Sequence, residues 1–180
     1  MKIIFLDLDG VLNNWYHPDL IALKNALVLK KILELSKAKI VITSSNKYPL
    51  QREKIKNIKG SYLEKYVDIL TKYGISLYDL TPYLNEDEDR SEEIKAYLKT
   101  NPEITDFVIV DDELASLDLL KYQVFLDWDR GLQEEHIKPI IDILDGKLGF
   151  YPPDYDLTEN SEQRLIRINR YYNQGKRKWR

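Results

Sequence analysis

The chain has 180 residues, of which 43% are hydrophobic and 32% are charged, and its formal net charge is −3 at pH 7. This composition is ordinary for a globular protein, and it excludes a disordered or fibrous chain. Cysteine is absent, which excludes disulfides, thiolate metal sites and cysteine catalysis. No apolar run approaches the roughly 20 residues that a membrane-spanning helix needs, so we expect a cytoplasmic protein with no membrane partner.

Short apolar runs alternate along the chain with segments of helical periodicity. In chain order we predict a strand at residues 3–6, a helix at 18–36, a strand at 40–42, helices at 50–58 and 61–73, a strand at 75–81, a helix at 91–99, strands at 107–110 and 124–126, and helices at 133–144 and near 159–172. Strands separated by helices of this length are typical of a parallel sheet covered on both faces. We therefore predict an α/β fold, a three-layer Rossmann-like parallel sheet of about five strands with helices on both faces.

Local signals mark several helix boundaries. Pro18 suits the first turn of the first helix. Ser61 and Glu64 have the spacing of a capping box, and Gly74 marks the end of the helix that they begin. Pro139 predicts that the helix at 133–144 is bent or begins late.

Charge is unevenly distributed along the chain, which bears on its domain organisation. Residues 1–150 carry 20 basic and 26 acidic side chains, a net charge of −6, whereas residues 151–180 carry seven and four, a net charge of +3. We predict one domain over residues 1–148 and a basic helical extension over residues 149–180. The extension suits either binding to nucleic acid or pairing with the acidic domain, and both roles stay open at this point.

Two carboxylates follow the first predicted strand, in the sequence Asp7-Leu8-Asp9-Gly10. Residues i and i+2 of an extended segment point the same way, so these carboxylates would meet at the carboxyl end of the strand, where parallel α/β sheets bind ligands. Two anionic groups this close need a cation between them or a proton on one of them. In a chain without cysteine, oxygen ligands favour Mg²⁺. The alternative is an ordinary Asp-Gly turn.

Hydroxyl side chains end the second predicted strand, at Thr43 and Ser44. Hydroxyls and free backbone N–H groups at a strand-to-helix transition can bind phosphate oxygens. Because Ser and Thr also cap helices, this signal alone does not separate the two functions.

Two adjacent acids, Asp111 and Asp112, follow the predicted strand at 107–110 and lead into a short helix. They place carboxylates at the same edge of the sheet, and capping of the helix that follows is the alternative. Three polar clusters thus end three buried strands on one edge. Such a coincidence of position favours a ligand site over three separate caps.

These motifs resemble those of the haloacid dehalogenase (HAD) superfamily of aspartate-nucleophile phosphatases. Residues 7–10 match the first motif of that family, Thr43 matches the second, and residues 111–112 match the fourth. The resemblance covers about residues 1–146. Residues 42–45 and 108–112 also resemble the small branch related to the phosphatase-like domain of Swiss Army knife RNA repair proteins.

The resemblance implies a mechanism. Asp7 would be the nucleophile that forms an aspartyl-phosphate, and Asp9 would be the acid and base that moves the proton. Mg²⁺ would be held by the Asp7 carboxylate, the Asp9 main-chain carbonyl, and Asp111 or Asp112.

The resemblance also implies a phosphate site that contains a cation. Thr43 and the Ser44 amide would bind the phosphoryl oxygens, together with the basic residue of the third motif. That basic residue is either Arg90 or Lys95, which lies one turn further along the predicted helix.

The predicted function is therefore Mg²⁺-dependent hydrolysis of a phosphomonoester. The segment between Leu12 and Pro18 is too short for a large cap, and crossover helices account for residues 46–89, so we predict a minimal cap. A site this open admits large substrates such as nucleic-acid ends or phosphoproteins, and we expect a phosphorylated substrate, with nucleotide or nucleic-acid-end phosphates as candidates. The alternative is a non-catalytic HAD-fold module that binds phosphate or nucleic-acid ends.

Overall fold

The structure, a computed structural model, describes residues 1–14, 19–47, 58–84, 89–147, 149, 151 and 166 of the chain. Most of the helix predicted at 50–58 lies outside the described residues. So do the predicted terminal helix, except for Ile166, and the seven basic side chains of residues 151–180. The domain division at residue 148, the role of the extension and the minimal cap therefore stay predictions.

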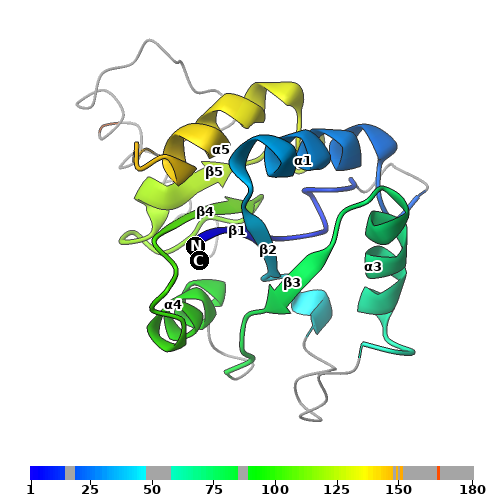
Figure 1. Cartoon of the computed structure of the whole chain (residues 1–180), viewed down its shortest axis with the longest axis horizontal. Coiled ribbons are helices and arrows are strands. Elements are labelled where there is room, and N and C mark those ends of the chain that lie inside the picture. The colour runs from blue at the N-terminus through cyan, green and yellow to red at the C-terminus, as the bar shows by residue number, and fades with distance from the viewer. Residues whose placement is uncertain are drawn as a thin grey trace, which may run out of the picture.

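Five parallel strands form one sheet, in the order β3-β2-β1-β4-β5. Their bounds are Lys2–Leu6 for β1, Lys39–Ile42 for β2, Leu77–Leu80 for β3, Asp106–Asp111 for β4 and Gln123–Phe125 for β5 (Figure 1). Each lies close to the segment predicted for it. The α/β fold with an all-parallel, Rossmann-like sheet is confirmed.

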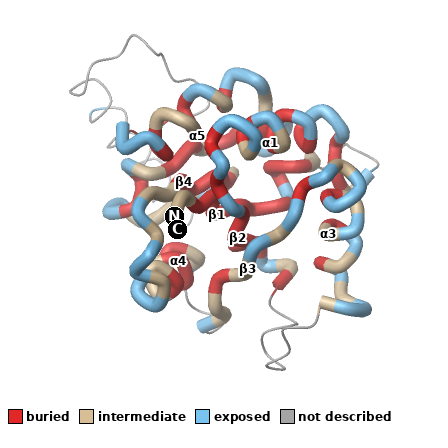
Figure 2. The backbone as a smooth tube through the Cα atoms, viewed as in Figure 1, coloured by how far each residue is buried: buried red, intermediate tan, exposed pale blue. Residues whose placement is uncertain are grey.

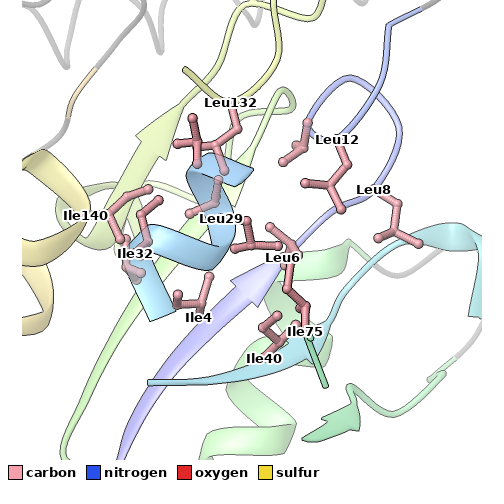
Figure 3. Packing of buried hydrophobic residues seen from close by; sticks show 14 of the residues in the cluster. Ile4, Leu6, Leu8, Leu12, Leu29, Ile32, Ile40, Ile75, Leu132 and Ile140 are labelled. Atoms are coloured by element: carbon pink, nitrogen blue, oxygen red, sulfur yellow. The ribbon is translucent and has the colours of Figure 1, made fainter. Parts of the chain in front are cut away.

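The larger core cluster lies between one face of the sheet and three helices. Side chains alternate along β1, and Ile4 and Leu6 belong to this cluster. Helices α1 (Leu23–Ser36), α3 (Tyr62–Lys72) and α5 (Ile137–Leu144) supply the other side of it. Figure 3 shows the leucine and isoleucine side chains of β1, α1 and α5 packed together.

A smaller cluster covers the opposite face of the sheet. Ile3 and Phe5 of β1 belong to it, and helix α4 (Arg90–Thr100) supplies Ile94 and Tyr97. The rings of Phe5 and Tyr97 meet edge to face with centroids 5.8 Å apart. Figure 2 shows the central strands buried between the helical layers, which explains why their sequences are continuously apolar.

Helix α1 begins at Leu23, so the predicted start at Pro18 is wrong. Pro18 itself lies outside the described residues, and residues 19–21 form a bend and not a helix. The N–H of Ala22 instead donates to the carbonyl of Leu12 at 2.7 Å, and Ala22 is extended. This contact with the loop after β1 holds the chain out of the helix until residue 23.

The predicted boundaries of α3 and α5 are confirmed. Ser61 caps α3 by accepting a hydrogen bond from the N–H of Glu64 at 3.2 Å. A 3₁₀ turn, η3 (Glu134–His136), precedes α5, so the α-helix begins late. Pro139 lies in its first turn, where a missing N–H breaks no helical hydrogen bond.

Two further 3₁₀ turns lie next to strands of the sheet. Turn η1 (Ser45–Lys47) comes after β2, and η2 (Leu120–Tyr122) comes directly before β5. The residues immediately after Asp112 form no helix, so the short helix predicted there is replaced by turns that reach η2. Within the part of the chain that the structure describes, no helix is long and apolar enough to cross a membrane.

Candidate active site

The carboxyl edge of the sheet brings together residues that are far apart in the sequence. Asp7 follows β1, Thr43 follows β2, and Asp111 is the last residue of β4. The hydrogen bonds between neighbouring strands continue one residue past the ends of β1 and β2. The N–H of Asp7 donates to the carbonyl of Val110 at 3.1 Å, and the N–H of Thr43 donates to the carbonyl of Leu6 at 2.9 Å. The register of three strands therefore fixes these residues side by side.

Three carboxylates meet at this edge. One oxygen from each of Asp7, Asp111 and Asp112 lies within 4.8 Å of the others. Asp7 and Asp111 are only 3% and 4% exposed. Gly10 makes room for the cluster: it has φ +73°, and a Cβ on it would lie 2.4 Å from the carboxyl carbon of Asp112. Only glycine meets both requirements.

The guanidinium of Arg90 lies against two of these carboxylates. Its Nη1 is 2.7 Å from Oδ2 of Asp7 and 3.1 and 3.0 Å from the two oxygens of Asp111. Arg90 is the first residue of α4, and Asp89 caps that helix by accepting a hydrogen bond from the N–H of Ser91 at 2.9 Å. The start of α4 thus places the guanidinium of Arg90 next to the carboxylates.

Burial and crowding change the proton affinities of these groups. Burial raises the pKa of Asp111 well above its usual value, and the neighbouring charge of Asp7 adds to this while Arg90 opposes it. Burial, and then the charge of Asp7, raises the pKa of Asp112 to about 6. Burial alone would lower the pKa of Arg90, but Asp111 and Asp7 outweigh it and raise this pKa.

The carboxylate cluster can hold a metal ion. Its donors are oxygens only, and one guanidinium cannot neutralise three carboxylates held this close together. Hard divalent cations prefer such ligands. The predicted ligand from Asp9 is a main-chain carbonyl, and its carboxylate is not part of the cluster. That ligand stays a prediction.

The hydroxyl of Thr43 is buried and has no hydrogen-bond partner among the described residues. A buried polar atom without a partner costs free energy, so a bound oxyanion that accepted its hydrogen bond would stabilise the site. Ser44 is also buried, and its Oγ accepts a hydrogen bond from Asn46 at 3.3 Å. The two predicted phosphate-binding residues therefore lie at the same edge as the carboxylates.

The carboxylate of Asp9 is held by three side chains. Oδ1 accepts hydrogen bonds from the Tyr66 hydroxyl at 2.5 Å and from Nδ2 of Asn13 at 2.9 Å. Oδ2 accepts a hydrogen bond from Nδ2 of Asn46 at 2.8 Å. Partial burial raises the pKa of Asp9, but these hydrogen bonds and the charge of Arg90 outweigh it, so the pKa lies below its usual value.

The two candidate cations of the third motif are placed differently. Lys95 points away from the carboxylate cluster, where it pairs with Glu92 at 2.8 Å and with Asp118 at 3.0 Å, and its side chain is 33% exposed. Arg90 contacts Asp7 directly. The structure therefore brings Arg90, and not Lys95, to the other predicted site residues.

Sequence reasoning missed a buried ion pair beneath the site. Lys47 and Glu93 are both fully buried, and their charged atoms lie 2.6 Å apart. Nζ of Lys47 also donates to the carbonyl of Thr43 at 3.0 Å, so the pair links the end of β2 to α4. Burial lowers the pKa of Lys47, and Glu93 offsets part of that change. The sequence did offer one indication of this ion pair, because Lys47 lies only three residues after Ser44 of the predicted phosphate-binding motif.

The side chains that hold Asp9 were missed as well. Asn13 and Asn46 each lie within four residues of a motif, which is a usable signal. Tyr66 lies 57 residues after Asp9 and has the spacing of a core residue on α3, so nothing local indicates its contact.

Of the comparisons with known proteins, the one with protein-family models gives a match. A family model described as the HAD domain in Swiss Army Knife RNA repair proteins matches residues 3–137, which include every predicted site residue. Nothing matches among curated proteins or solved structures. The match spans most of the chain and confirms the resemblance seen in the motifs: the chain belongs to the family of HAD domains found in Swiss Army Knife RNA repair proteins.

Proposed function

We propose that the protein is a Mg²⁺-dependent phosphomonoester hydrolase that works through an aspartyl-phosphate on Asp7. The observation that carries this proposal is the cluster of Asp7, Asp111 and Asp112 around Arg90 at the carboxyl edge of the sheet. Membership of a HAD family supports hydrolase chemistry of this type.

The residues of the cluster fit a magnesium ion. Asp7, Asp111 and Asp112 would hold it with their carboxylates, and Asp9 would add its main-chain carbonyl. When bound, the ion would offset the repulsion between an anionic carboxylate and an anionic phosphate.

Two hydrogen bonds to the Asp7 carboxylate support its proposed role as the nucleophile. Its Oδ1 accepts a hydrogen bond from the N–H of Leu8 at 2.8 Å, and its Oδ2 accepts one from Arg90 at 2.7 Å. A carboxylate held at both oxygens loses little rotational freedom in the transition state. The new bond from Asp7 to phosphorus would form as the bond to the leaving oxygen breaks, and Asp9 would supply the proton to that oxygen.

The second step would reverse the proton transfer. Asp9 would accept a proton from the water that attacks the aspartyl-phosphate, which releases inorganic phosphate and restores Asp7. Thr43, the Ser44 amide and Arg90 would stabilise the charge on the phosphoryl oxygens in both steps.

The substrate class that we propose is nucleotide or nucleic-acid-end phosphates. The family description refers to RNA repair proteins, which supports a nucleic-acid substrate. Residues 151–180 carry a net charge of +3 and would hold the phosphodiester backbone. The absence of cysteine is compatible with the cytoplasmic setting that such a substrate suggests.

The mechanism is tested by Asp7→Asn in purified protein with Mg²⁺ and para-nitrophenyl phosphate. The amide cannot act as the nucleophile, so turnover should disappear while the thermal midpoint shows that the fold persists. Asp68→Asn makes the same chemical change at an exposed position of α3 and should leave turnover unchanged. Near wild-type activity in Asp7→Asn would overturn the mechanism. A wild-type protein that binds phosphate but turns over no ester would favour the non-catalytic module.

The substrate class is tested with 5′- and 3′-phosphorylated oligoribonucleotides. Their affinity should fall steeply with salt, and the slope should shrink when Arg164, Arg167 and Arg170 are replaced by Gln. Substitution is preferable to deletion because Tyr151 forms a bridge with Val124 of β5. No binding at low salt would overturn the nucleic-acid substrate and leave a general phosphomonoesterase.

A further inference from the structure

The carboxylate of Asp9 is held by side chains from three separate segments. Asn13 comes from the loop after β1, Asn46 from η1, and Tyr66 from the middle of α3. Asn13 is itself fixed, because its Oδ1 accepts the N–H of Gly10 at 3.1 Å and its Nδ2 also donates to the carbonyl of Leu20 at 3.0 Å. Asp9 is an exposed residue, yet its carboxylate accepts three side-chain hydrogen bonds.

Tyr66 differs from the two asparagines in its surroundings. Its side chain is fully buried on the face of α3 that also carries Leu63 and Leu70. Its ring packs edge to face against Tyr62, with centroids 5.6 Å apart. Packing leaves the Tyr66 ring little freedom, so the hydroxyl reaches Asp9 from a rigid support.

The hydrogen bonds are divided unequally between the two oxygens of Asp9. Oδ1 accepts two, from Tyr66 and Asn13, and this uses both of its acceptor positions. Oδ2 accepts one from Asn46 among the described residues, which leaves it an acceptor position. Oδ2 is therefore the oxygen that can gain and lose a proton without breaking a hydrogen bond.

We propose that Tyr66 is a positioning residue for proton transfer by Asp9. This role rests on the proposed phosphomonoester hydrolysis. It further specifies which oxygen of Asp9 transfers the proton and which side chains hold the carboxylate in place. Tyr66 and Asn13 fix Oδ1, so that Oδ2 faces the leaving oxygen. As the phosphorus bond to that oxygen breaks and the bond to Asp7 forms, the proton passes from Oδ2 to the leaving oxygen. Oδ2 regains a proton from the water that later attacks the aspartyl-phosphate.

The test compares two esters on the same preparation of Tyr66→Phe with Mg²⁺. Phenyl phosphate has a leaving oxygen that needs a proton, whereas 2,4-dinitrophenyl phosphate has one that departs as a stable anion. Loss of the Tyr66 hydroxyl should lower kcat/KM for phenyl phosphate by about 10- to 100-fold. It should change kcat/KM for the dinitrophenyl ester by less than about threefold. The ratio of the two values does not depend on the folded fraction, so reduced stability cannot imitate the result.

Tyr73→Phe is the matched control, since it removes a tyrosine hydroxyl at the residue that ends the same helix and that is not among the side chains holding Asp9. Its ratio should equal that of the wild type. Equal losses for both esters in Tyr66→Phe would assign Tyr66 a structural role and overturn the proposal, and so would no loss for either. A wild-type protein that hydrolyses neither ester would instead overturn the proposed function itself, and the positioning role with it.

Discussion

Replacing Lys47 by Met should destabilise the protein far more than replacing Lys47 and Glu93 together. The two side chains are fully buried and their charges lie 2.6 Å apart. Without Lys47, the carboxylate of Glu93 keeps the Thr81 hydroxyl at 3.4 Å, and its Oε1 has no partner among the described residues. The carboxylate would then be buried with no opposite charge to compensate it.

The expected cost follows from this burial. Breaking one side of a buried ion pair costs about 3–5 kcal/mol in unfolding free energy. In a protein of this size that corresponds to a fall of roughly 6–20 °C in the thermal midpoint. The double variant Lys47→Met with Glu93→Leu removes both charges and leaves apolar side chains. It should cost only about 1 kcal/mol, because the carbonyl of Thr43 still loses the hydrogen bond from Lys47.

A double-mutant cycle by urea unfolding measures the coupling. We expect a coupling energy of about 5–9 kcal/mol for this pair, because each single variant should cost about 3–5 kcal/mol and the double variant only about 1 kcal/mol. Lys95→Met and Glu92→Leu form the control cycle, since that pair lies on the same helix at 2.8 Å but is exposed to solvent. Its coupling should be about 1 kcal/mol or less. If Lys47→Met costs no more than Lys95→Met, or if the double variant is as unstable as the single one, the burial argument is refuted.

Four further predictions concern the candidate site and the buried side chain of His136. Arg90→Ala should lower kcat about 100-fold or more, while Lys95→Ala should stay within about threefold of wild type; equal effects would contradict the placement of these cations. Calorimetry should show no Mg²⁺ binding when Asp111 and Asp112 are both replaced by Ala. In the wild type, protonation of Asp112, whose pKa is raised to about 6, and of Asp111, whose pKa is also raised, should weaken Mg²⁺ binding by at least about tenfold between pH 7 and pH 5, and constant affinity would rule this out. Burial lowers the pKa of His136 to about 4, so the unfolded chain takes up the proton at a higher pH than the folded protein does. The free energy of unfolding should therefore fall by about 1.4 kcal/mol per pH unit as the pH drops from about 6.5 to 4. The variant His136→Gln should lack this contribution to the pH dependence of the free energy of unfolding.

The sheet and its acidic edge were predictable because their signals are local. β1 and β4 are buried on both faces, so their sequences are apolar runs, and Asp7 and Asp111 stand directly at their ends. The start of α1 was not predictable in this way. It depends on a hydrogen bond between Ala22 and Leu12, which no periodicity reveals.

The choice between Arg90 and Lys95 could have been made from the helix pattern. Ile94 and Tyr97 form the apolar face of α4, and Arg90 lies on that face by its i, i+4, i+7 spacing, whereas Lys95 does not. Tyr66 gave no such signal. Its spacing on α3 is that of a core residue. The contact of its hydroxyl with Asp9 depends on how α3 packs against the loop after β1, which the local sequence does not indicate.

The central place of β1 in the sheet has a consequence for synthesis of the protein. Leu6 pairs with Ile42 on one side and with Val110 on the other, so β1 is completed by a strand that is translated much later. Such distant pairing makes folding slow. A nascent chain that stops before β4 lacks the carbonyl that holds the amide of Asp7. We therefore expect truncated translation products to lack the proposed activity, because Asp7, the proposed nucleophile, is set in place only when the sheet closes around it.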